Sequence, residues 1–122
     1  MQNLFDAIRA MDLSKVAQIL NDNPKTANST DPKGFTPLIL AAYVDAGDIV
    51  DHLLDRGANI NAQDAIGNTA LMGVCFKGNK DLAIRLIQKG ADIDISNHKG
   101  QTAIDYARQF GHDNLVDLLN SH

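Results

Sequence analysis

The sequence predicts an all-α fold, a solenoid of stacked helix-turn-helix units with projecting hairpin loops. Three observations support this fold class. The pattern Gly-x-Thr begins at Gly34, Gly67 and Gly100, at a constant spacing of 33 residues. The hydrophobic residues between these points follow the period of amphipathic helices, and turn residues separate the helical segments. A stacked structural unit recurs along a chain, whereas a catalytic loop usually occurs once. The pattern therefore indicates a structural repeat and not a catalytic motif.

The first helix of each unit is expected to start at a threonine. Thr36, Thr69 and Thr102 suit the N-cap position, where the hydroxyl oxygen accepts a hydrogen bond from a free backbone N–H. Pro37 then occupies the first helical position, where its missing N–H costs nothing. In the second unit, the apolar face of this helix is formed by Leu38, Ala41 and Ala42.

The second helix of each unit has its own start and stop signals. Asp48 and Asp81 fall at its start, where a carboxylate complements the positive end of the helix dipole. Gly57 and Gly90 are expected to end it in the left-handed conformation. The stretch 58–67 has turn residues and no helical stripe, so it predicts an extended connecting loop.

The turn between the two helices differs in the second unit. Asp45 stands where Gly78 and Gly111 stand in the next two units. Since glycine adopts the left-handed conformation most readily, the sequence predicts that this turn shifts towards Gly47.

The repeating pattern resembles the ankyrin repeat. From Asp31 to Asn61 the chain reads D-x-x-G-x-T-P-L, then A-A, then V-x-x-L-L-x-x-G-A-N-x-N. The resemblance covers the whole chain as a single domain, residues 1–122, with units at 31–63 and 64–96. A degenerate unit at 1–30 is expected to act as the N-terminal cap, and a shorter unit at 97–122 as the C-terminal cap. Short stand-alone proteins of this kind look most like the bacterial members of the family.

The two terminal units depart from the pattern. In the first, apolar residues match the helix stripe at an offset of 34 residues: Leu4, Ala7, Ile8, Val16, Ile19 and Leu20. In the last, Asp105, Arg108 and Asn120 replace apolar or small residues, and a terminal repeat needs such a polar outer face for solubility. The array is therefore expected to be complete. The family usually has a histidine after T-P-L, but Ile39, Met72 and Asp105 stand there, so the hydrogen-bond network of that histidine is not expected.

Composition limits the classes of function. The chain has 122 residues, a net charge of −4, and aspartate for all fifteen of its acidic residues, which argues against a general nucleic-acid or anionic-membrane binder. A single cysteine, Cys75, excludes an internal disulfide and fits a reducing compartment. No secretory signal or membrane-spanning stretch can be recognised. A cytoplasmic location is expected.

No catalytic, cofactor or metal site is predicted. Cys75 takes the place of the buried Ala42 one unit on, so an inert core thiol is expected. The four histidines have no ligand spacing, which argues against zinc. The aspartates of 45–48 and 92–94 lack the order of a calcium loop. The protein is therefore expected not to be an enzyme.

The resemblance implies that partners are contacted by the loop tips and by the inner side of the first helices. Carried onto this chain, those positions are Pro32, Lys33, Phe35, Tyr43, Val44, Arg56 and Gln63, then Ala65, Ile66, Asn68, Phe76, Lys77, Lys89 and Ser96, and finally His98, Lys99, Gln101, Gln109 and Phe110. The partner-binding residues predicted from this set are Lys33, Phe35, Tyr43, Val44, Ile66, Asn68, Phe76, Lys77, Lys99, Gln101 and Phe110. The full set contains four of the six aromatic residues and five of the eleven basic residues, but no aspartate. Aromatic and cationic side chains are typical of binding hot spots.

The predicted function is therefore protein–protein interaction through the concave face and loop tips, without catalysis. The partner is expected to present an apolar patch of acidic character, and the chain is expected to be a monomer without a membrane partner. Two alternatives stay open. The same face could bind a second copy of the chain, or a basic groove could bind nucleic acid through Lys33, Lys77, Lys89 and Lys99.

Overall fold

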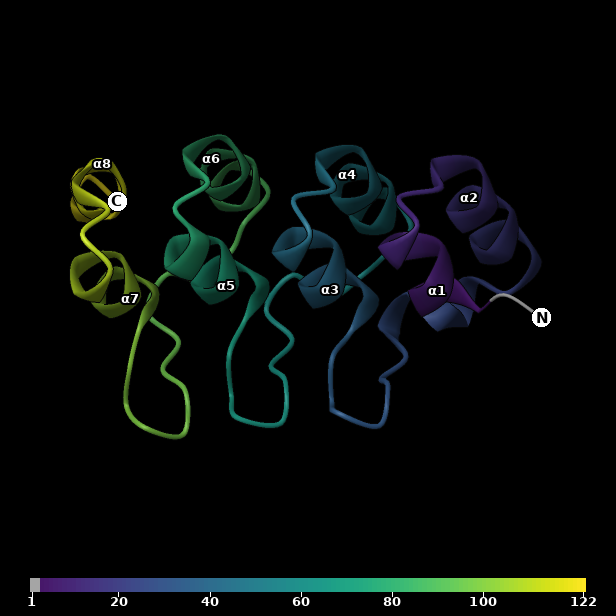
Figure 1. The fold of residues 1–122 in the computed structure, drawn as a ribbon, viewed down its shortest axis with the longest axis horizontal. Helices are drawn as coiled ribbons and strands as arrows, with labels where there is room; N and C mark the ends of the chain where they lie inside the picture. The colour runs from purple at the N-terminus through teal and green to yellow at the C-terminus, as the bar shows by residue number, and fades with distance from the viewer. Residues whose placement is uncertain (1–2) are drawn as a thin grey trace.

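The protein is an array of helix pairs in the computed structural model, which describes residues 3–122 (Figure 1). Over that range the structure has eight α-helices, one short 3₁₀ helix and no β-strand, which confirms the all-α solenoid. The elements in chain order are α1 (Leu4–Arg9), α2 (Leu13–Asp22), the 3₁₀ helix η1 (Pro24–Asn28), α3 (Pro37–Tyr43), α4 (Gly47–Asp55), α5 (Ala70–Lys77), α6 (Lys80–Gln88), α7 (Ala103–Gln109) and α8 (Asp113–Asn120).

The elements form three rows. Figure 1 shows the second helices α2, α4, α6 and α8 in one row, the first helices α1, α3, α5 and α7 in the next, and the long loops beyond them. The first helices make most of the contacts between neighbouring pairs. No helix in the described part of the chain has the length and apolar character needed to cross a membrane.

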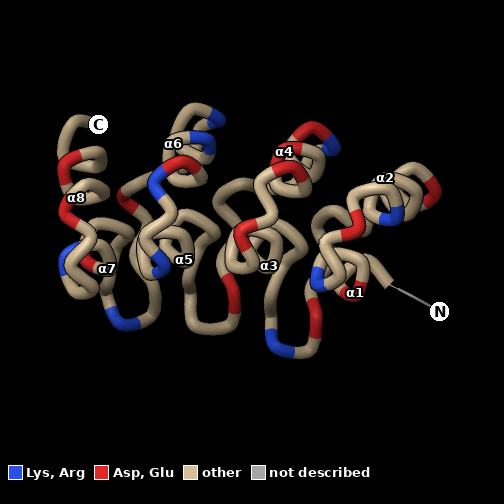
Figure 2. The backbone as a smooth tube through the Cα atoms, turned by 45° about the horizontal axis from the view of Figure 1, so that its top comes forward, with Lys and Arg blue, Asp and Glu red and all other residues tan. Residues whose placement is uncertain are grey.

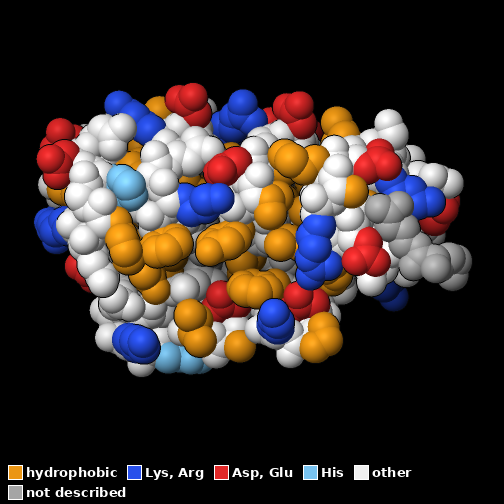
Figure 3. Space-filling model, in the orientation of Figure 1, with side chains coloured by type: hydrophobic (Ala, Val, Ile, Leu, Met, Phe, Trp, Pro, Cys, Tyr) orange, Lys and Arg blue, Asp and Glu red, His pale blue; other side chains and the backbone are white. Residues whose placement is uncertain are grey.

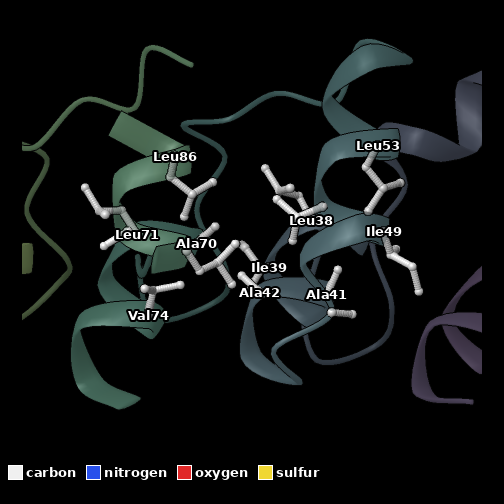
Figure 4. Close-up of a cluster of buried hydrophobic side chains, with 14 of the residues drawn as sticks. Leu38, Ile39, Ala41, Ala42, Ile49, Leu53, Ala70, Leu71, Val74 and Leu86 are labelled. Atoms are coloured by element: carbon white, nitrogen blue, oxygen red, sulfur yellow. The ribbon is translucent and has the colours of Figure 1, made fainter. Parts of the chain in front are cut away.

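One hydrophobic core runs through the whole array. Leu38 and Leu71 from the first helices meet Leu53 and Leu86 from the second helices (Figure 4), and each is at most 1% exposed. The small side chain of Ala42 lets α3 and α5 approach each other closely, and it is buried as well. The core therefore lies between the two helix rows and holds the first helices at fixed positions.

The threonines cap the first helices as predicted. The Thr36 hydroxyl accepts a hydrogen bond from the Ile39 N–H at 3.1 Å, and the Thr69 hydroxyl accepts one from Met72 at 3.3 Å. Thr102 is also an N-cap, and the Asp105 carboxylate accepts a hydrogen bond from its N–H at 2.9 Å. Asp105 thus completes a capping interaction that the preceding units lack.

The ends of the second helices also agree with the prediction. Asp48 and Asp81 lie in the first turns of α4 and α6. Gly57 and Gly90 follow the last helical turns with φ of 88° and 98°, in the left-handed region where glycine has no steric cost. The N–H of Ala58 donates to the Leu53 carbonyl at 3.0 Å, which closes the end of α4.

The predicted shift of the second turn towards Gly47 was wrong. Asp45 itself adopts the left-handed conformation, with φ of 60°, as Gly78 does one unit on. Aspartate tolerates this conformation better than most residues do. In addition, its carboxylate accepts a hydrogen bond from the Asn79 side-chain amide at 3.1 Å. Gly47 is instead the first residue of α4, where a Cβ would force the Arg85 guanidinium to move.

The two terminal helix pairs pack as their sequences predict. The face of α1 and α2 that was expected to be apolar lies in the core, with Ile19 only partly buried. At the other end, Arg108 and Asn120 are exposed, and the Arg108 guanidinium lies 4.0 Å from the Asp105 carboxylate. The boundaries of the four units stay a prediction.

The three long loops share one closing interaction. In each, a side-chain oxygen of the opening residue accepts hydrogen bonds from the backbone N–H groups two and four residues further on, at 2.9 to 3.0 Å. The opening residues are Asp31, Asp64 and Asn97. Because this turn is the same in every loop, it places equivalent residues at the three loop tips.

Candidate functional site

Exposed apolar side chains gather on one face of the protein. Figure 3 shows a hydrophobic band across this face, over the row of first helices. Its most exposed aromatic residues are Tyr43 at 48%, Phe110 at 44% and Phe76 at 37%. We define the aromatic surface as Phe35, Tyr43, Ile66, Phe76 and Phe110. Solvated apolar side chains in one continuous area are typical of binding surfaces.

The aromatic rings of this surface hold one another in place. Phe76 contacts Phe110 edge to face, with ring centroids 4.7 Å apart and an interplanar angle of 89°. Its ring centroid also lies 6.4 Å from that of Tyr106. These distances are within the range in which aromatic pairs attract each other. These two contacts favour one orientation of the Phe76 ring in the unbound protein.

A cavity of about 270 Å³ opens into the aromatic surface between α3, α5 and the loop that precedes α5. It contains five of the predicted partner-binding residues, namely Phe35, Tyr43, Ile66, Asn68 and Phe76. The other residues that line it were not predicted: Ile39, Asp64, Thr69, Met72, Gly73 and Tyr106.

The residues that the prediction missed have a signal in the sequence. Ile39 and Met72 stand where the resemblance leads one to expect a polar histidine, and both are buried in the floor of the cavity. Gly73 stands where the units before and after it have Leu40 and Tyr106. Departures from the repeat at otherwise structural positions therefore mark this cavity.

Lys77 is bound by neighbouring groups of the protein. Its Nζ lies 3.2 Å from the Asp45 carboxylate and donates a hydrogen bond to the Tyr43 carbonyl at 2.6 Å. The same Nζ lies 5.1 Å from the centroid of the Tyr43 ring, within the range of a cation–π interaction. Lys77 thus orients Tyr43, while Asp45 balances its charge.

Lys89 and Arg56 do not join the aromatic surface. They follow the second helices α6 and α4. The Lys89 Nζ lies 3.8 Å from the carboxylates of both Asp51 and Asp55. The Arg56 guanidinium donates a hydrogen bond to the side chain of Asn21. Both cations therefore connect second helices of neighbouring units.

Asn68 and Gln101 belong to a hydrogen-bond network between the loops. The side-chain amide nitrogen of Asn97, which is buried, lies within hydrogen-bond distance of the Asn68 oxygen (2.9 Å), the Tyr106 hydroxyl (3.1 Å) and the Gln101 oxygen (3.2 Å), so its two N–H groups are shared among three acceptors. The Tyr106 hydroxyl donates in turn to Asn68 at 3.2 Å. These two predicted site residues thus have partners within the protein and fix one edge of the cavity.

The remaining predicted residues divide between loop tips and core. Lys33 and Lys99 are exposed at the tips of two loops (Figure 2), and no carboxylate of residues 3–122 lies within 4.0 Å of either ammonium group. Ile66 occupies the equivalent position in the loop between them. Val44 is partly buried against the core, so its packing is explained by the fold.

Cys75 lies in the core, close to the aromatic surface in sequence but separate from it. Its side chain is fully buried, and burial raises the pKa of this thiol to about 12. The nucleophilic thiolate is therefore almost absent at neutral pH. Among the described residues, no group of three or more His, Cys or Asp side chains is arranged to hold a metal ion.

A comparison with known protein families identifies the architecture. Residues 44–122 match the family model described as ankyrin repeats (3 copies), which covers more than half of the chain. The chain belongs to the ankyrin repeat family. Ankyrin repeats are in general protein–protein interaction modules and typically lack catalytic activity. The search of curated proteins found no match, so the likeness of this ankyrin-repeat protein to bacterial members stays a prediction.

Proposed function

We propose that this ankyrin-repeat protein binds another protein through its aromatic surface and loop tips, without catalysing a reaction. The observation that carries the proposal is the position of Tyr43 and Phe76 on successive first helices, at the edge of one apolar cavity. Rigid aromatic side chains lose little conformational entropy on binding and often supply most of the affinity. The mechanism is occupancy: the protein masks or positions its partner.

The charge around the aromatic surface supports a partner with acidic character. Lys33 and Lys99 are exposed at two loop tips, whereas Lys77 is paired with Asp45. A cation at the rim of an interface raises the rate of association with an acidic partner more than it raises the affinity. We therefore propose that the loop-tip lysines increase the rate of association with an acidic partner and that the aromatic residues supply most of the binding free energy. The lone buried thiol fits a cytoplasmic location.

Nucleic-acid binding is the weaker alternative. Of the four lysines that would form a basic groove, Lys77 and Lys89 are paired with aspartates. The net charge of the chain is −4, and nucleic-acid affinity depends on uncompensated positive charge. A steep loss of affinity with added salt, without regard to nucleotide sequence, would support this alternative against the proposal.

The proposal is tested with a partner recovered by affinity purification from an extract of the source organism. The dissociation constant is measured by calorimetry for the native chain and for Tyr43→Ala and Phe76→Ala. Truncation of an aromatic anchor often costs about 2 kcal/mol, so each variant is expected to bind roughly thirtyfold more weakly. Circular dichroism checks that both variants stay folded.

Asp55→Ala is the matched control. Its side chain is 72% exposed on α4 and lies outside the cavity, and a solvated surface charge contributes little to stability. This variant is expected to bind as the native chain does. If Asp55→Ala weakens binding while both aromatic variants bind normally, the aromatic surface is not the binding site. Light scattering of the native chain at several concentrations tests self-association, for which the mass would rise with concentration.

A further inference from the structure

Gly73 is a glycine that the fold itself does not require. Of the nine glycines, seven have a positive φ, and a Cβ at Gly47 would force the Arg85 guanidinium to move. Gly73 lies inside α5 with a helical conformation. A Cβ at this position would meet only the Tyr43 ring, at 3.9 Å, which is an ordinary contact. Because glycine is unfavourable inside a helix, alanine would serve the fold better here.

The missing side chain of Gly73 shapes the cavity in the aromatic surface. The equivalent residue is Leu40 in the unit before and Tyr106 in the unit after, and both side chains pack against the core cluster. At Gly73 no such side chain exists, and the residue lines the cavity together with Tyr43 and Phe76. The glycine thus leaves open a space that a leucine would fill.

The size and lining of this cavity suit one large apolar side chain. Its volume of about 270 Å³ is below the roughly 300–1,000 Å³ of typical small-molecule sites. Its floor is Ile39 and Met72, and its walls combine four aromatic rings with the polar residues Asp64, Asn68 and Thr69. An acidic side chain entering this space would lose its hydration and would lie near the Asp64 carboxylate, which lines the cavity. A leucine or phenylalanine would instead bury apolar surface against the floor and the aromatic rings.

The charges at the loop tips predict which residues of the partner flank that apolar side chain. Ile66 lies at the edge of the cavity, and the equivalent residues of the two neighbouring loops are Lys33 and Lys99 (Figure 2). Neighbouring units stack about 8–10 Å apart, and an extended chain advances about 3.3 Å per residue. Acidic residues roughly two to four positions on either side of the apolar one would therefore reach the two ammonium groups.

We propose that the cavity at Gly73 binds one leucine or phenylalanine side chain of an extended partner segment, with acidic residues on both sides of it that pair with Lys33 and Lys99. This inference rests on the proposed function, because it places the partner on the aromatic surface. It goes further in naming the element of the partner that is recognised and the residue of this chain that makes room for it.

The test uses a defined peptide, acetyl-Asp-Ser-Ser-Leu-Ser-Ser-Asp-amide, titrated into the ¹⁵N-labelled protein. Amide shifts of Ile66 and Gly73 report occupancy of the cavity. Two matched peptides replace the central leucine by alanine or both aspartates by lysine. Burial of a leucine side chain predicts at least about tenfold tighter binding than for the alanine peptide. The lysine peptide is expected to bind more weakly by up to about fivefold for each pair lost.

Gly73→Leu is the decisive variant, because it copies the residue of the preceding unit and fills the cavity. It is expected to lose at least about tenfold in affinity for the leucine peptide. Gly73→Ala is the second variant, should leucine disturb the fold. It is expected to melt at the native temperature or above and to bind the leucine peptide more weakly than the native chain does.

The outcomes separate this inference from the proposed function. Equal binding of the leucine and alanine peptides, or native binding by a folded Gly73 variant, overturns the cavity assignment. If peptide binding then still depends on Tyr43 and Phe76, the aromatic surface remains the binding site. If no peptide shifts any resonance of this surface, the inference is wrong. The proposed function is then tested by the binding of the purified partner to Tyr43→Ala and Phe76→Ala. A dimer that disappears in Gly73→Leu would make a second copy of the chain the occupant.

Discussion

Single residues mark where this protein departs from its own repeat. Residues 42, 75 and 108 are equivalent, and they are alanine, cysteine and arginine. The first two are fully buried between first helices, whereas Arg108 is exposed on the last one. The environment therefore changes from closely packed to solvated at the end of the array, and the side chain changes with it.

Cys75 is predicted to react slowly with thiol reagents in the native protein. Its side chain is buried, so a reagent must wait for the structure to open. Labelling with iodoacetamide should be far slower than for the urea-unfolded chain. Cys75→Ala should fold with a loss of about 1 kcal/mol, a typical value for a point mutation. Rapid labelling of the folded protein would contradict the burial and support a redox-sensing thiol.

The same thiol predicts a change of stability at alkaline pH. Burial raises the pKa of Cys75 to about 12 from an ordinary value of 9.0, so the unfolded chain loses this proton first. The contribution of this thiol to stability should therefore be constant below pH 9 and decrease as the pH rises towards 12, with a slope of at most about 1.4 kcal/mol per pH unit. Urea unfolding of the native chain and of Cys75→Ala at several pH values measures this change of stability. An identical pH dependence for the two would contradict the shift.

At the scale of elements, the helices were predictable because local signals determine them. Thr36 and Thr69 cap their helices, and Gly57 ends α4, as the side-chain chemistry of each residue requires. The turn at Asp45 was not predictable in the same way. Its conformation is supported by Asn79, which lies in the following unit. A contact between units is not encoded in the local sequence.

The candidate site was predictable in part for the same reason. The exposure of Tyr43 and Phe76 could be predicted because repeat positions that do not serve the fold keep their side chains at the surface, and their role in binding stays a prediction. The cavity between them was missed because it depends on an absent side chain at Gly73. The pairing of Lys77 with Asp45 was missed because it joins two units in space. Repeat equivalence gives the position of a side chain but not its contacts.

The network around Asn97 is predicted to stabilise the junction of the last two loops. Asn97→Asp keeps the oxygen that closes the loop, as Asp64 does one unit earlier. However, it removes the amide that donates to Asn68, Gln101 and Tyr106. The Gln101 and Tyr106 oxygens, which are partly buried, lose this donor, whereas Asn68 still accepts from the Tyr106 hydroxyl. The expected loss of stability is about 1 kcal/mol, which urea unfolding measures. Asp64→Asn is the control and should change stability by less than about 0.5 kcal/mol.

The second helix α6 is predicted to contribute a large part of the stability through Leu86. This side chain is fully buried between the helix rows. Leu86→Ala should cost roughly 2–5 kcal/mol, out of about 5–15 kcal/mol for a typical domain. A lower urea midpoint with an unchanged slope would agree with this loss. An unchanged midpoint would mean that the core face of α6 has been placed wrongly.

At the scale of the whole molecule, each helix pair is stabilised by its neighbours. The first helices pack on those of the adjacent pairs, and the hydrophobic core is continuous from α1 to α8. Within residues 3–122, inner pairs are covered on both sides, whereas the pair α7–α8 has a neighbour on one side. In such an array, stability is approximately the sum of the units and the interfaces between neighbours. The terminal pair is therefore stabilised by fewer interfaces than an inner pair is.

The position of a leucine along the array should thus determine how many helices are destabilised when it is replaced by alanine. Leu119 in α8 is equivalent to Leu86 in α6, 33 residues earlier, and both are buried. Leu119→Ala is expected to speed amide hydrogen exchange mainly in α7 and α8, because the terminal pair can open alone. Leu86→Ala is expected to speed exchange in α3 to α8, because opening an inner pair removes the packing of both its neighbours. Hydrogen exchange followed by mass spectrometry on the two variants measures this difference. If Leu119→Ala speeds exchange equally along the whole chain, the array unfolds as one indivisible unit, and the nearest-neighbour description is wrong for this protein.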